Sequence, residues 1–182
     1  MKALTLVWTA AATAATAALG GLATDPESRW YTTLRKPEWQ PPALAFPIVW
    51  SALYADIAVT SAVALNSGGP GGAHGNEATA GEGRPCGGPS AAERQKAIRA
   101  YRAALAANLA LNAGWSWLFW RSRKPWLAAA EAGVLALSSA DLARRTYALN
   151  RTAGVALVPY PLWCGFATVL SAAIARLNPR RH

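Results

Sequence analysis

Apolar residues in this chain gather in long stretches instead of alternating with polar ones. Because a helix rises about 1.5 Å per residue, about 20 mostly apolar residues cross the hydrocarbon core of a bilayer. Five stretches reach or nearly reach that length with two charges or fewer: Leu4–Ala23, Ala43–Leu65, Ala103–Trp120, Trp126–Ala143 and Thr152–Ala175. The pattern predicts a multi-pass integral membrane protein that contacts the lipid bilayer along most of its length.

The composition of these stretches favours helices over strands. They are rich in Ala and Leu, which are good helix formers, and period-two alternation is nearly absent. A helix also satisfies its own backbone hydrogen bonds inside a bilayer. We therefore expect an all-α fold, one domain over residues 1–182, built as a bundle of five transmembrane helices.

The first and the last stretch each leave an alternative open. Leu4–Ala23 follows Lys2 and ends in small residues, so a cleaved signal peptide fits as well as a first membrane helix. Thr152–Ala175 contains Pro159 and Pro161, which predict a kink or a later start of the last helix.

Residues 67–90 differ from the rest of the chain. Ser67–Ser90 holds nine of the 15 glycines and three of the 12 prolines, with no apolar periodicity. Such a segment cannot bury enough surface to offset the entropy of ordering it. We predict a disordered loop inserted between the second and third helices.

The charges lie at the ends of the apolar stretches. The chain has 18 Lys and Arg against 9 Asp and Glu, a net charge of +9. Five spans place nine basic residues on each side of the membrane, so the positive-inside rule does not choose an orientation. No basic patch lies on a soluble module, which argues against a nucleic-acid partner.

Few residues suit catalysis or metal binding. The only histidines, His74 and His182, lie in the glycine-rich segment and at the C-terminus, which argues against a metal or haem centre. Cys86 and Cys164 form no disulfide framework. The sequence offers no nucleophile with a base and no paired carboxylates, so a binding protein is favoured over an enzyme. Asp56 stands alone within the second span.

Aromatic and amide side chains share faces of the predicted helices. Phe46, Trp50 and Tyr54 recur every four residues, while Asn112 and Trp115 lie three apart on the third helix. Such stripes serve helix packing or line a ligand site, and spacing alone leaves both open. On the third helix, a track of small residues permits close approach of a second copy, so a homodimer is a hypothesis: Ala106, Ala110 and Gly114.

The segment between the first two helices is stiff and aromatic. It carries Trp30 and Tyr31, followed by Trp39 in a run with three prolines, Pro37, Pro41 and Pro42. It is either an aromatic belt at the membrane interface or a lid over a cavity between the helices.

Taken together, five segments resemble the TspO/MBR family of tryptophan-rich sensory proteins and mitochondrial translocator proteins. The resemblance is carried by residues Trp30–Pro42, Phe46–Tyr54, Asn108–Trp120, Arg121–Pro125 and Val158–Leu170, in the family's order. It implies five transmembrane helices and retention of the first one.

The resemblance also implies a ligand. Family members bind porphyrins such as protoporphyrin IX, with no cofactor required, in a pocket between the helices under the first loop. The matching positions in this chain are Tyr31, Trp39, Phe46, Trp50, Tyr54, Asn112, Trp115, Trp163 and Ala167. The implied role is a sensor in stress or tetrapyrrole regulation. The alternatives are a light-dependent porphyrin-degrading enzyme and a tetrapyrrole transporter.

This chain departs from the family pattern at a few positions. Asn108 replaces a glutamine, Trp117 a proline, and Ala172 the tyrosine of the mammalian sterol-recognition segment. The last change argues against sterol binding and favours a bacterial-type member in a bacterial cell membrane. The tryptophans outside the implied pocket are assigned to helix packing or the interface: Trp8, Trp30, Trp117, Trp120 and Trp126.

Overall fold

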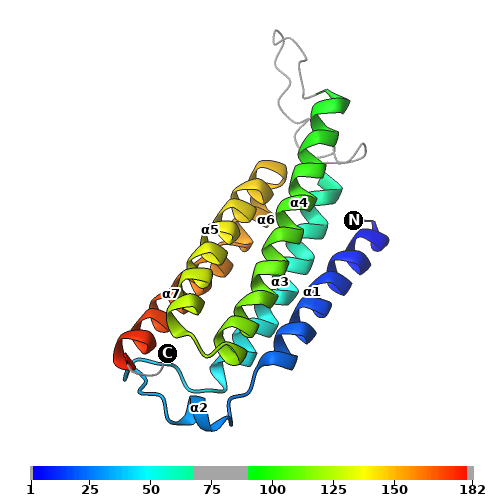
Figure 1. Ribbon diagram of the computed structural model, residues 1–182. Helices are drawn as coiled ribbons and strands as arrows, with labels where there is room; N and C mark the ends of the chain where they lie inside the picture. The colour runs from blue at the N-terminus through cyan, green and yellow to red at the C-terminus, as the bar shows by residue number, and fades with distance from the viewer. Residues whose placement is uncertain (1, 68–89, 180–182) are drawn as a thin grey trace.

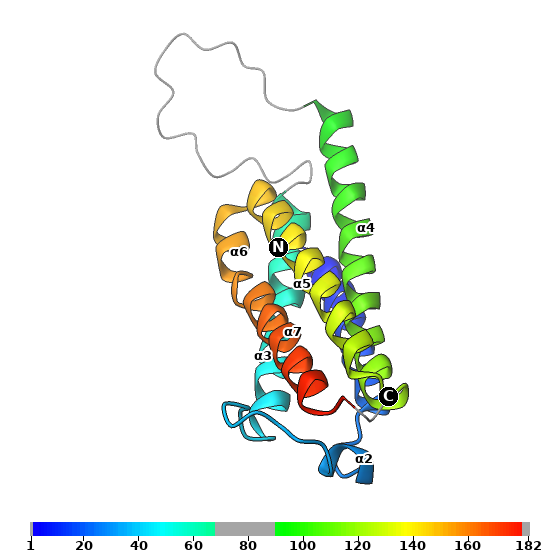
Figure 2. The same cartoon turned by 60° about the vertical axis from the view of Figure 1, so that its left-hand side comes forward.

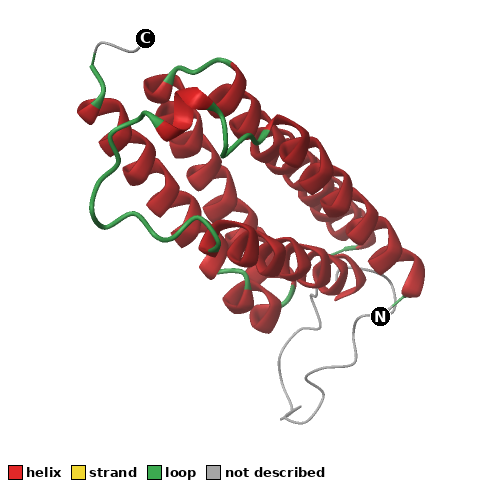
Figure 3. Cartoon of the chain, turned by 90° about the horizontal axis from the view of Figure 1, so that it is seen from below, coloured by secondary structure: helices red, strands yellow, loops and turns green. Residues whose placement is uncertain are grey.

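The protein is a bundle of five long helices (Figure 1). The computed structural model describes residues 2–67 and 90–179, and every regular element drawn for them in Figure 3 is a helix. The prediction of an all-α membrane bundle is confirmed. The elements are α1 (Ala3–Ala23), α2 (Arg29–Thr32), α3 (Ala45–Ser67), α4 (Ala91–Ser116), the π-helix η1 (Trp117–Arg121), α5 (Pro125–Leu149), α6 (Arg151–Ala156) and α7 (Pro159–Leu177).

Four helical segments are long and apolar enough to cross a membrane. They are α1, α3, α5 and the combined segment of α6 and α7, residues Arg151–Leu177. The fifth long helix, α4, carries five charged residues in its first half and becomes apolar from Ala103 onward. Its apolar half packs against α1 and α5, as the third predicted span requires.

The first helix is part of the bundle. It packs against α3 and α4, and the buried Thr9 hydroxyl donates a hydrogen bond to the carbonyl oxygen of Ala58 on α3 at 2.8 Å. A row of threonines, with Thr13 and Thr16, faces inward and bonds its own helix backbone. The structure therefore supports a membrane helix at Leu4–Ala23.

The helix predicted from Ala103 is α4, and it begins twelve residues earlier, at Ala91. Ser90 caps it: the Ser90 hydroxyl accepts from the Glu93 amide while the Glu93 carboxylate accepts from the Ser90 amide. This S-x-x-E capping box is a recognisable sequence pattern, but it lies before the apolar run from which the helix was predicted. The hydrogen bonds from Ser90 also lower the pKa of Glu93 below its ordinary value. Of the predicted loop 67–90, Ser67 ends α3 and Ser90 caps α4, and residues 68–89 lie outside the described residues.

The last predicted span is broken in two, which confirms the kink or later start expected from its prolines. α6 ends at Ala156 and α7 begins with Pro159, whose missing N–H suits the first helical turn. Gly154 lets α6 fold back on α5, because a Cβ there would lie 2.3 Å from the Tyr147 Cα. Figure 2 shows α6 at the opposite end of the bundle from α2.

The core lies along the bundle axis. Its larger part packs Leu53 and Ile57 of α3 against Leu105 of α4, Leu142 of α5 and Tyr160 of α7. A smaller, aromatic-rich cluster lies at the end where α2 sits. The lower part of the bundle thus packs rings rather than aliphatic chains, and the cavity described next lies among them.

Candidate ligand-binding cavity

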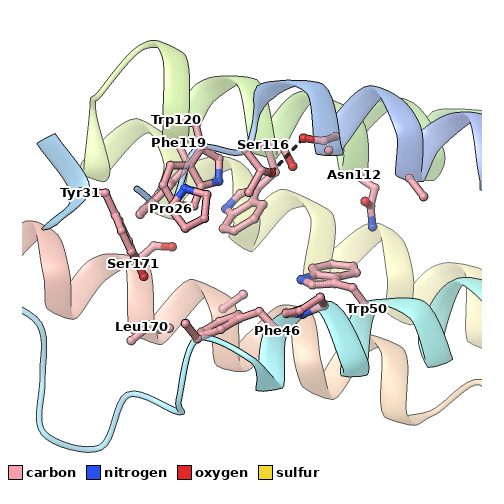
Figure 4. Close-up of a pocket in the computed structure, with 18 of the residues that line it drawn as sticks. Pro26, Tyr31, Phe46, Trp50, Asn112, Ser116, Phe119, Trp120, Leu170 and Ser171 are labelled. Carbon is pink, nitrogen blue, oxygen red and sulfur yellow. Dashed lines mark hydrogen bonds between the residues drawn. The ribbon is translucent and has the colours of Figure 1, made fainter. Parts of the chain in front are cut away.

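A cavity of about 560 Å³ lies between the helices at the α2 end of the bundle (Figure 4). Its volume is within the range of small-molecule sites. Eight aromatic side chains line it: Tyr31, Phe46, Trp50, Tyr54, Trp115, Phe119, Trp120 and Trp163. Among the described lining residues only Glu27 is charged, so the cavity suits a largely uncharged, flat ligand.

The wall from α3 is the aromatic stripe seen in the sequence. Phe46, Trp50 and Tyr54 all line the cavity because four-residue spacing places them on one face. The Trp50 ring lies 5.7 Å from that of Tyr54 and 6.4 Å from that of Trp115. Asp56 is half-buried and does not line the cavity.

The wall from α4 and η1 extends further than predicted. Asn112 and Trp115 line the cavity as expected, and Phe119 continues their face, with its ring stacked on Trp115 at 5.6 Å. Trp120 lines the cavity too, which corrects its assignment to helix packing or the interface. The π-helix places one extra residue in this turn, so the adjacent Phe119 and Trp120 both turn inward. Phe119 could have been found four residues after Trp115, whereas the π-helix has no readable signal.

The α1–α3 connection covers one end of the cavity. Tyr31 of α2 lines the cavity at this end, with its ring 4.6 Å from that of Trp120 and the Lys36 ammonium 3.8 Å from its centroid. Gln40, which the sequence did not single out, also lines the cavity, and its amide Nε2 donates to the Tyr31 hydroxyl at 3.4 Å. Burial raises the pKa of the Tyr31 phenol and the hydrogen bond from Gln40 opposes that shift, so the hydroxyl stays protonated at neutral pH.

This connection is fastened to the end of α7. The Asn178 amide bonds the backbone of Arg35 in both directions: its Oδ1 accepts from the Arg35 N–H at 3.0 Å, and its Nδ2 donates to the Arg35 carbonyl at 2.9 Å. Leu34 is buried beside it, in the cluster that contains Phe119. The geometry therefore supports the lid interpretation of this segment.

The wall from α7 contains Trp163 and Ala167, as the resemblance implied. The Trp163 ring lies 6.0 Å from that of Phe46, and the small Ala167 leaves room beside it. Trp39 is the one implied site residue that does not line the cavity. Its side chain is half exposed and meets the edge of Phe166, because a turn from Pro37 to Gln40 directs Gln40 inward instead.

A chain of hydrogen-bonded side chains leads from the cavity wall into the bundle. The Tyr54 hydroxyl lies 2.6 Å from Asn112 Oδ1, Asn112 Nδ2 lies 2.9 Å from the Tyr160 hydroxyl, and that hydroxyl lies 2.8 Å from Asn108 Oδ1. Asn108 Nδ2 then lies 3.1 Å from Ser139 Oγ. The two asparagines of α4 thus find the partners that amides in an apolar helix require.

Metal chemistry finds no support in the part of the chain that the structure describes. No group of three or more His, Cys, Asp or Glu side chains there could hold an ion. Cys164 is a buried free thiol on α7, and Cys86, His74 and His182 lie outside the described residues.

Comparison with known proteins accounts for this arrangement of helices and aromatic residues. The model of the TspO/MBR family matches residues 6–177, nearly the whole chain. The chain belongs to the TspO/MBR family. The match includes almost all of α1, in agreement with its place in the TspO/MBR bundle.

Several relatives have similar length and sequence. The chain is 31% identical over 155 residues to the "Tryptophan-rich protein TspO" of Chlorobaculum tepidum, covering 85% of this chain and 82% of that protein. It is 30% identical over 171 residues to the "Tryptophan-rich sensory protein" of Cereibacter sphaeroides (94% and 89% covered). The "Translocator protein homolog" of Schizosaccharomyces pombe is 31% identical over 151 residues (81% and 77% covered). The protein is therefore a multi-pass membrane protein of the TspO/MBR family.

Proposed function

We propose that this TspO/MBR protein binds porphyrins or related tetrapyrroles in the cavity and acts as a sensor in stress or tetrapyrrole regulation. The observation that carries the proposal is the lining of eight aromatic side chains around about 560 Å³. A porphyrin is a large flat π-system, and aromatic rings stack on such a surface or meet it edge-on. The Cereibacter sphaeroides relative is named a "Tryptophan-rich sensory protein", which supports the sensor part of the proposal.

The cavity also has polar groups at the α2 end, the Tyr31 hydroxyl and the Gln40 amide. Polar groups at the edge of a tetrapyrrole would find hydrogen-bond partners there. No further cofactor is required for binding.

Binding is tested by titrating the purified protein with protoporphyrin IX in darkness and following tryptophan fluorescence and porphyrin absorbance. We expect saturable binding at micromolar protein, weakened roughly three- to tenfold by Trp50→Phe through lost ring contact. Trp126→Phe is the matched control, since Trp126 is about half exposed at the start of α5 and does not line the cavity. Absence of saturable binding, or equal loss in both variants, would contradict the proposal.

The same titration in light tests the enzyme alternative. The ring of Trp163, which lines the cavity, would lie close to a bound chromophore. Protein-dependent loss of porphyrin absorbance in light, reduced by Trp163→Phe and absent in darkness, would assign light-dependent breakdown to this cavity. Equal absorbance in light and darkness supports the sensor.

A further inference from the structure

The direction of every hydrogen bond in the buried chain from Ser139 to Tyr54 can be determined. The hydroxyl of Ser139 on α5 has one proton. That hydroxyl lies 2.7 Å from the carbonyl oxygen of Leu135, which can only accept, while the Cys164 sulfur is farther away at 3.6 Å. Ser139 therefore donates to Leu135, and its Oγ accepts from Asn108.

This assignment fixes the Asn108 amide. Its Nδ2 must face Ser139, where the distance is 3.1 Å, so its Oδ1 faces the Tyr160 hydroxyl at 2.8 Å. An amide oxygen only accepts, and therefore the single proton of Tyr160 points to Asn108. Asn108 and Tyr160 are fully buried, so no water is available to offer an alternative partner.

The position of the Tyr160 proton also determines the orientation of the Asn112 amide at the cavity wall. Because the Tyr160 proton is used, the group of Asn112 that faces it at 2.9 Å must be the Nδ2 donor. The Asn112 Oδ1 is then turned to Tyr54, whose hydroxyl donates its only proton across 2.6 Å. What Tyr54 has left to offer is the lone pairs of its oxygen.

We propose that the inner wall of the cavity is a hydrogen-bond acceptor, the Tyr54 oxygen, held in that state by the chain Asn112–Tyr160–Asn108. The cavity then selects flat ligands that bring an N–H or O–H donor to this wall. The inference rests on the proposed function in assuming that the cavity takes up a flat ring system.

Three tricyclic probes of nearly the same shape separate donor from acceptor. Acridone carries an N–H opposite its carbonyl, 10-methylacridone lacks that proton, and xanthone has a ring oxygen in its place. All three keep the carbonyl, so they differ only at the position opposite it. We expect acridone to bind the full-length protein in detergent about tenfold more tightly than xanthone, which corresponds to one neutral hydrogen bond. Binding is measured by fluorescence of the probe and by competition.

Variants assign the preference to named atoms. Tyr54→Phe should bring the affinity for acridone down to that for xanthone, whereas Trp115→Phe should weaken all three probes to a similar extent. Tyr160→Phe, which frees the Asn112 amide to turn over, should reduce the preference while Tyr54 is still present. Asn108→Leu should do the same from one link further away, and a thermal unfolding curve checks that each variant is folded.

Two results would overturn the proposal: equal affinity of the folded protein for acridone and xanthone, or a preference that survives in Tyr54→Phe. Failure of saturable acridone binding would count against it as well. Protoporphyrin IX binding, measured on the same samples, keeps the two proposals apart. Lost porphyrin binding with a retained acridone preference contradicts the proposed ligand class alone. Retained porphyrin binding without a preference contradicts the direction of the chain alone.

Discussion

At the scale of single residues, the apolar helices differ in how their buried polar atoms are satisfied. Tyr101 of α4 bonds Ser61 and Thr146 at 3.0 and 3.1 Å, deep in the bundle. Both carboxylate oxygens of Glu131 on α5 are inaccessible and have no hydrogen-bond partner among the described residues. A buried polar group without a partner carries its desolvation cost uncompensated. The buried Glu131 side chain therefore lowers the stability of the fold.

Replacing Glu131 by leucine should stabilise the protein by about 1–3 kcal/mol, because it removes the uncompensated group and adds apolar contact. Asp141→Leu is the control on the same helix. Its partly exposed carboxylate pairs with Arg144 at 2.8 Å and with Arg145 at 2.5 Å. Loss of these two ion pairs should cost about 0–1 kcal/mol of stability. Thermal unfolding in detergent measures both. A lower melting temperature for Glu131→Leu would contradict this prediction, because it would mean that the buried carboxyl makes a stabilising interaction.

At the scale of elements, two interruptions of the helices shape the protein. The π-helix η1 turns Phe119 and Trp120 into the cavity, and the break before Pro159 separates α6 from α7. Pro159 and Pro161 predict the second interruption, since a residue without an N–H ends a helix or begins one. The π-helix η1 could not be predicted from the sequence, because Trp117–Arg121 reads as a continuation of α4.

Gly154→Ala tests the return of α6. The new Cβ would lie 2.3 Å from the Tyr147 Cα and 2.5 Å from its backbone nitrogen, so α6 must shift, and we expect a loss of about 1–3 kcal/mol. Gly165→Ala on α7 is the matched control, because a Cβ there meets nothing within 4 Å. In a helix interior that change should stabilise by about 0.5–1 kcal/mol. Unfolding midpoints that move equally for both would contradict the close approach at Gly154.

At the scale of the whole molecule, the cavity lies at one end of the bundle. The connection through α2 and the end of α7 lie at that lower end in Figure 1. On α4, Ala106 and Ala110 are exposed, and a Cβ at Gly114 would meet nothing within 4 Å. This face is open to lipid or to a second copy.

Releasing the connection from α7 should loosen the cavity. Asn178→Ala removes both hydrogen bonds to Arg35, so we expect faster hydrogen exchange over residues 24–44 and dissociation of protoporphyrin IX roughly three- to tenfold faster. Asn66→Ala is the control, since that amide accepts from the Lys2 N–H at the opposite end of the bundle. Unchanged exchange in Asn178→Ala would show that the connection is held by its buried Leu34 instead.

The homodimer through α4 stays a prediction with its own test. Ala110→Leu would obstruct close helix approach and should lower the dimer fraction seen by light scattering and by cross-linking in membranes. Ala130→Leu places the same side chain at an exposed position of α5 and should leave that fraction unchanged. A dimer equally stable in both variants would place the interface elsewhere.

The sequence by itself determined the membrane bundle, the aromatic stripe of Phe46, Trp50 and Tyr54, and the stiffness of the first connection. These depend on local periodicity and on proline, which act within a few turns of one helix. Only the tertiary structure decided that Gln40 rather than Trp39 faces the cavity and that Trp120 joins its wall. It also fixed the direction of the Tyr54 hydroxyl. Those outcomes depend on a turn, a π-helix and hydrogen bonds across α3, α4, α5 and α7, which no local pattern encodes.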